Sequence, residues 1–60
     1  MTEDHFVKLL ELELRRRFAR FSLADLQAFV ADVWPLARED PDVDRWTREF
    51  LDSGRCTTRA

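Results

Sequence analysis

Apolar residues recur through the first third of the chain at intervals of three and four. The recurring positions are Phe6, Val7, Leu10, Leu14, Phe18 and Phe21. At about 3.6 residues per turn, this spacing places them on one face of an α-helix. The alternation of Leu10, Leu12 and Leu14 with glutamates also fits a half-buried strand, but it stops at a run of three arginines, and the flanking residues favour helix. The pattern therefore predicts a helix over residues 4–20.

A second apolar stripe follows Ser22, which forms a variant of the capping box with Asp25 three residues later. The members of this stripe are Leu23, Leu26, Phe29, Val30, Val33, Leu36 and Ala37. Pro35 falls inside the segment, but the stripe keeps its phase through it, and the proline projects from the polar side. A proline placed there bends a helix around the core rather than ending it. We therefore expect one helix over residues 23–39, kinked at Pro35.

The third helix is predicted over residues 41–52. Asp40 is a good N-cap, Pro41 suits the first helical position, and the acidic residues that follow favour a helix N-terminus. The expected inward face comprises Val43, Trp46, Phe50 and Leu51, with Trp34 of the preceding helix also at an inward phase. Gly54 ends the helix, and residues 55–60 form a flexible tail with nothing to bury. The sequence thus predicts an all-α, three-helix bundle spanning residues 1–54.

Size and composition limit the class of protein. A chain of 60 residues is near the lower limit for independent folding, so association with another chain is a natural source of extra stability. Cys56 is the single cysteine, which excludes an internal disulfide. No apolar run approaches the roughly 18 residues of a membrane span, and the net charge is −2. These features favour a soluble cytoplasmic protein that does not contact a membrane.

The sequence offers no constellation for catalysis, for a metal or for a cofactor. His5 is the only histidine, and Ser22 is committed to a helix cap. The D-x-D-x-D run beginning at Asp40 resembles the start of a calcium loop, but Arg45 and Leu51 stand where such a loop needs Gly and Glu. A glycine-rich loop is also missing from the sequence. We therefore predict no enzymatic activity, no small-molecule substrate, no metal and no cofactor.

Four arginines near the end of the first helix could indicate a nucleic-acid surface: Arg15, Arg16, Arg17 and Arg20. On a helix they spread over more than half the circumference. Glu11 and Glu13 precede two of them by four residues, the favourable order for helical ion pairs. The acidic third helix also suits a DNA groove poorly. A nucleic-acid-associated regulator, in which a dimer brings these arginines together, is therefore the second choice.

A second row on the first helix is not explained by the predicted core. It comprises His5, Leu9, Leu12, Arg16 and Ala19, at spacings of four and three. Leu12 points well away from the inward stripe, and the row is similar to a short coiled-coil seam. The alternative is that Leu9 widens the core and Leu12 is a solitary exposed leucine. The favoured interpretation is a non-enzymatic interaction or regulatory module that self-associates through its first helix as a homodimer or binds another protein there.

Overall fold

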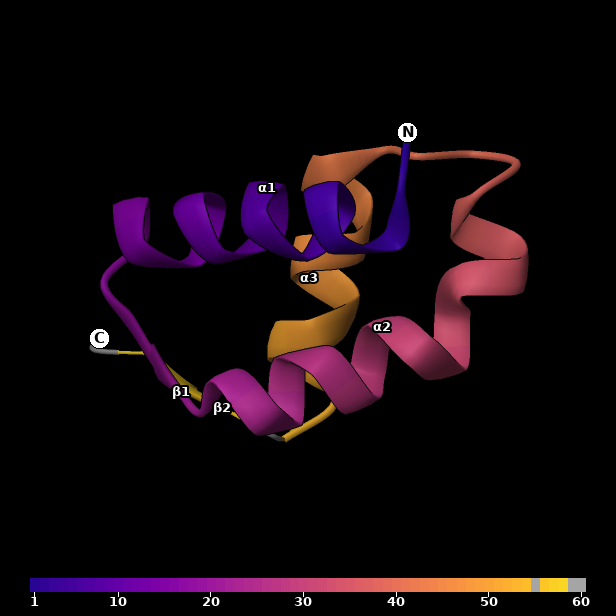
Figure 1. Cartoon of the computed structure of the whole chain (residues 1–60). Helices are drawn as coiled ribbons and strands as arrows, with labels where there is room; N and C mark the ends of the chain where they lie inside the picture. Colours follow the sequence, from indigo (N-terminus) through magenta and orange to yellow (C-terminus); the bar gives the residue numbers. More distant parts are fainter. Residues whose placement is uncertain (55, 59–60) are drawn as a thin grey trace.

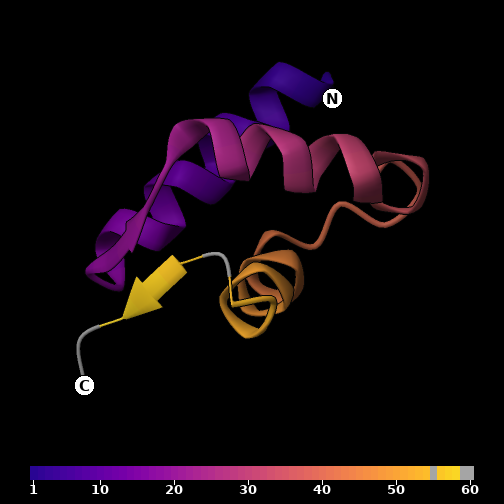
Figure 2. The same cartoon turned by 90° about the horizontal axis from the view of Figure 1, so that it is seen from below.

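Three α-helices and a pair of short strands form the structure, a computed structural model that describes residues 1–54 and 56–58 (Figure 1). The elements in chain order are α1 (Glu3–Arg16), β1 (Ala19–Phe21), α2 (Leu23–Ala37), α3 (Val43–Asp52) and β2 (Cys56–Thr58). In Figure 1, α1 runs above α2, and Figure 2 shows α3 nearly end-on beside them. Each helix contacts the other two. The predicted all-α bundle of three helices is confirmed.

The core lies where the inward faces of the three helices meet. Its large members are Phe6, Leu10 and Leu14 from α1, Leu26, Phe29 and Val30 from α2, and Trp46 and Phe50 from α3. The rings of Phe29 and Phe50 meet edge to face with their centroids 5.1 Å apart. Trp34 is only half-buried, and its ring lies 5.6 Å from that of Phe6. Full burial of each large apolar side chain in the core stabilises the fold by about 1.5–3 kcal/mol.

The first helix ends at Arg16, so its predicted extension to residue 20 is wrong. The N–H of the C-cap Arg17 donates to carbonyls of the last turn, and Phe18 then adopts a left-handed φ of 58°. This conformation turns the chain out of the helix. The side chain of Phe18 is 77% exposed, which overturns its predicted place in the core. Phe21 does pack on the core, from a strand, with its ring edge-on to Phe50 at 6.4 Å.

The two short strands pair antiparallel, with Ala19 opposite Thr58 and Phe21 opposite Cys56. The sequence predicted helix for residues 19 and 20 of the first strand and a flexible tail over residues 55–60. Cys56–Thr58 instead form a strand, while residues 55, 59 and 60 lie outside the described residues. The hydrogen bonds of such a ladder join segments that are distant in the sequence, so local patterning gives no signal of it.

The second helix begins at its expected cap, but Leu23, the first member of its predicted inward stripe, is 48% exposed. Ser22 is its N-cap and accepts a hydrogen bond from the N–H of Asp25 at 3.5 Å, and the helix runs through Pro35. Figure 1 shows α2 changing direction toward its C-terminal end. The helix ends at Ala37, two residues earlier than predicted. Leu36 is 67% exposed rather than inward. Neighbouring helix positions differ by about 100°, and Ala37 is the one that faces the core.

The third helix starts at Val43, two residues later than predicted, because Asp42 rather than Asp40 is its N-cap. The carboxylate of Asp42 accepts a hydrogen bond from the N–H of Arg45 at 3.2 Å. Asp40 instead closes the connection between α2 and α3. Its carbonyl oxygen accepts a hydrogen bond from Nε1 of Trp46 at 2.8 Å, and its carboxylate pairs with Arg45 at 2.9 Å.

Candidate functional site: the outer face of helix α1

One face of α1 remains outside the bundle, and Leu12 is at its centre. Leu10 and Leu14 are fully buried, whereas Leu12 between them is 59% exposed. Two residues along a helix correspond to a rotation of about 200°, so Leu12 points almost opposite to its two neighbours in the core. The exposure predicted from the sequence is thus observed at this position.

Four of the five residues in the predicted row lie on this outer face of α1. His5, Leu12 and Arg16 are exposed, and Leu9 is half-buried. The half-buried apolar side chains that pack on the core among the described residues are Ala19, Phe21, Val33, Trp34, Val43 and Leu51, a set that does not include Leu9. Ala19 lies in β1 and packs on the core, so it does not continue the row. The outer face therefore comprises His5, Leu9, Leu12 and Arg16.

Carboxylates of the same helix pair with the arginines at the end of α1. Arg15 lies 3.0 Å from Glu11, and Arg17 lies 3.3 Å from Glu13, the two (i, i+4) pairs expected from the sequence. Arg16 lies 3.6 Å from Glu13 as well. Exposed pairs of this kind stabilise a helix by about 0.2–0.5 kcal/mol each, and they also neutralise much of the positive charge.

Arg17 additionally joins the end of α1 to α3. Its guanidinium donates a hydrogen bond to the carboxylate of Asp44, which also accepts one from Arg48 at 2.6 Å. The hydrogen bond from Arg17, aided by the positive charge of Arg48, holds the pKa of Asp44 below its ordinary value. Arg17 therefore has a structural role that the sequence did not suggest, because its partner belongs to a distant helix.

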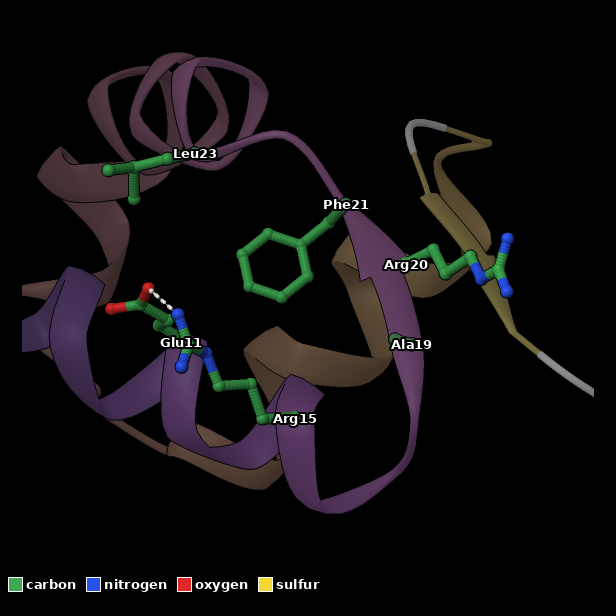
Figure 3. Close-up of a pocket in the computed structure, with 6 residues that line it drawn as sticks. All are labelled: Glu11, Arg15, Ala19, Arg20, Phe21 and Leu23. Atoms are coloured by element: carbon green, nitrogen blue, oxygen red, sulfur yellow. Dashed lines mark hydrogen bonds and ion pairs between the residues drawn. The ribbon is translucent and has the colours of Figure 1, made fainter.

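The four arginines do not gather into one basic surface. Arg20 lies in β1, and Figure 3 shows its side chain directed away from Arg15 and from the Glu11–Arg15 ion pair. Arg15, Arg16 and Arg17 are each paired with a carboxylate. This geometry adds no support to the nucleic-acid interpretation, which stays an untested prediction.

An open hollow lies beside this face, between α1 and the start of α2 (Figure 3). Its lining residues are Glu11, Arg15, Ala19, Arg20, Phe21 and Leu23, and an adjoining hollow shares Glu11 and Leu23 and adds Asp4, Val7, Lys8 and Gln27. These linings contain no hydroxyl, thiol or imidazole that could serve as a nucleophile or neutral base. The sequence did not predict the hollow, because it depends on the path from α1 through β1 into α2.

The D-x-D-x-D run is used for capping and ion pairing. Asp42 caps α3, Asp40 pairs with Arg45, and Asp44 pairs with the two arginines described above. Within residues 1–54 and 56–58, no group of three His, Cys, Asp or Glu side chains is arranged to hold a metal ion. In the same part of the chain, every helix is too short or too polar to cross a membrane.

Comparison with known protein families, with curated proteins and with solved structures finds no match for this chain. What the protein does must therefore follow from the chemistry of its own surface.

Proposed function

We propose that this protein is a small non-enzymatic interaction module that self-associates through the outer face of α1. The main observation that supports this proposal is the position of Leu12, which is 59% exposed on the side of α1 opposite to the core. A single exposed leucine is ordinary on a protein surface. Leu12 differs because Leu9 lies one turn earlier on the same face without joining the core. Together they form a short apolar strip along the helix.

Burial of this strip would contribute appreciably to a weak association. Fully burying a leucine side chain is worth about 1.5–3 kcal/mol, so covering the exposed part of Leu12 is worth about 1–2 kcal/mol per copy. A two-fold interface counts each contribution twice, since the same patch is buried on both copies. A domain of this size has a small core, so that gain matters to its overall stability.

The charges around the strip are also compatible with self-association. Arg15 and Arg16 are each paired with a glutamate of their own helix, at 3.0 Å and 3.6 Å. Two approaching copies would therefore meet Arg15 as an ion pair rather than a bare guanidinium group, whereas Arg16 shares Glu13 with Arg17 and keeps part of its charge. Long arginine side chains can also lay their apolar stems against a neighbouring leucine.

The test compares two leucines that are similarly exposed on different helices. Solution mass is measured over a dilution series for the wild type, for Leu12→Glu and for Leu36→Glu, with circular dichroism on the same samples. We expect the wild type to dimerise as concentration rises, Leu12→Glu to stay a folded monomer, and Leu36→Glu to behave as the wild type. Leu14→Glu serves as a core control and should unfold the domain, because it buries an unpaired charge.

Three outcomes would overturn the proposal. A wild type that stays monomeric at every concentration, with full helicity, would leave Leu12 a solitary exposed leucine. An equal loss of association in Leu12→Glu and Leu36→Glu would place the interface away from the outer face of α1. If Leu12→Glu itself unfolded a monomeric protein, the assignment of the inward face would be wrong.

A further inference from the structure

The charges beside the strip specify how two copies are oriented. We infer that two copies of this chain pair through α1 with the two helices parallel, and that Lys8 of each copy faces Glu13 of the other. The inference rests on the proposed self-association and adds its orientation and register. It follows from which charged residues flank Leu9 and Leu12 on each side.

The outer face has the spacing of a coiled-coil seam. His5 and Leu12 fall at one seam position of the seven-residue repeat, and Leu9 and Arg16 fall at the other. Along one flank of this seam lie Lys8 and Arg15, both exposed. The opposite flank carries Glu13. The two flanks therefore bear opposite charges, basic on one side and acidic on the other.

Opposite flanks of this kind distinguish the two possible orientations. In a parallel pair, a residue on one flank faces a residue five positions later on the other flank of the second helix. Lys8 then faces Glu13 of the second copy, and two-fold symmetry repeats the contact. In an antiparallel pair centred on Leu12, like flanks meet, so Lys8 approaches the arginines at the end of the second helix. Attraction therefore favours the parallel pair, and repulsion opposes the antiparallel one.

The two charged partners are available for this contact. Lys8 is exposed and makes no ion pair with any other described residue. Glu13 is half-buried, with Oε1 3.6 Å from Arg16 and Oε2 3.3 Å from Arg17. A carboxylate has about four acceptor sites, so it accommodates an ammonium group in addition to these two arginines.

The parallel arrangement also stacks like residues along the axis. Leu9 packs on Leu9 and Leu12 packs on Leu12 of the second copy, which gives two adjacent leucine layers at the centre. His5 forms the layer at the N-terminal end. Arg16 forms the opposite end, where two like charges meet; its side chain is 80% exposed and pairs with its own Glu13. The Arg16 layer weakens the pair, so the dimer is expected to be a dissociable one.

The first experiment asks whether Lys8→Glu weakens or tightens the dimer. The dimer dissociation constant is measured for the wild type, for Lys8→Glu and for Arg38→Glu, an equal change of charge at an exposed position beyond α2. The parallel pair predicts that Lys8→Glu weakens association by about fivefold or more, because two attractions become repulsions. The antiparallel pair predicts tighter association, because the Lys8→Glu variant would attract the arginines. Tighter association would overturn the inference.

The second experiment locates the pairing by disulfide formation. In a Cys56→Ser background, His5→Cys, Leu12→Cys and Leu36→Cys are oxidised separately, with Leu36→Cys giving the rate of random collision. A parallel pair cross-links at positions 5 and 12 well above that rate, since each residue faces itself. Cross-linking at position 12 without position 5 would overturn the orientation and leave the proposed function standing. Collision rates at both positions, with a monomer at every concentration, would overturn both.

Discussion

Thr47 is the residue at which the structure makes its sharpest prediction about stability. It lies on α3 and is fully buried, and its Oγ1 has no hydrogen-bond partner among the described residues. Most buried hydroxyl groups in proteins do have a partner, because water satisfied them before folding. An unsatisfied buried hydroxyl costs about 1–3 kcal/mol.

Replacing this hydroxyl by a methyl group should therefore stabilise the fold. Thr47→Val keeps the shape of the side chain, and the two residues have similar helix propensities. Taking the low end of the desolvation cost, we expect the free energy of unfolding to rise by about 1 kcal/mol. For a domain of this size, that increase corresponds to a melting temperature higher by about 4–8 °C.

Thr47→Ser is the matched control because it keeps the hydroxyl and removes the methyl group. It should lower the free energy of unfolding by about 1 kcal/mol, the value of one buried methyl group with its cavity. Both variants and the wild type are unfolded by heat and by urea, followed by circular dichroism at a concentration low enough to exclude association. If Thr47→Val were less stable than the wild type by 1 kcal/mol or more, the hydroxyl would have a partner in the folded protein, and the reasoning would fail.

Two further predictions concern the end of α1. Phe18 has a φ of 58°, a conformation that glycine adopts at no steric cost, and its side chain is exposed. Phe18→Gly should therefore raise the free energy of unfolding, measured by urea titration, by about 0.5–1 kcal/mol. A loss of stability would show that the aromatic ring is needed. Arg17 lowers the pKa of Asp44, so the stability that this carboxylate contributes is present above its unfolded pKa of about 3.9 and is lost as the pH falls through the lower folded value. Wild type should therefore exceed Asp44→Asn in stability at pH 7 and match it near pH 2, and a difference independent of pH would contradict the role of the charge.

Helix types and most of their inward positions could be predicted from the sequence because they depend on local spacing. The period of Phe6, Leu10 and Leu14 identifies α1 without knowledge of any other segment, and all three side chains are fully buried. Ser22 likewise predicts the start of α2, since an N-cap side chain bonds to a backbone N–H only three positions away. The exposure of Leu12 followed from the same period.

The wrong helix boundaries lie where the local sequence offers two equally good positions or no signal for the end of a helix. Asp40 and Asp42 are both good N-caps, and the choice between them is made by Arg45 and Trp46, which engage Asp40 from α3. The continuation of the apolar period through Phe18 concealed the end of α1. A left-handed turn there would ordinarily be marked by glycine, and phenylalanine gives no such signal.

The sequence by itself determined three helices, most of their buried positions and the outward position of Leu12, because the helical period is a property of consecutive residues. Only the tertiary structure decided the end of α1, the pairing of Ala19–Phe21 with Cys56–Thr58, the hydrogen bond from Arg17 to Asp44 and the hollow beside Leu23. The end of α1 rests on the left-handed φ of Phe18 and the hollow on the path from α1 into α2, whereas the strand pairing and the hydrogen bond from Arg17 join segments far apart in the chain. Such contacts form only when the packed helices bring the segments together, so no local pattern encodes them.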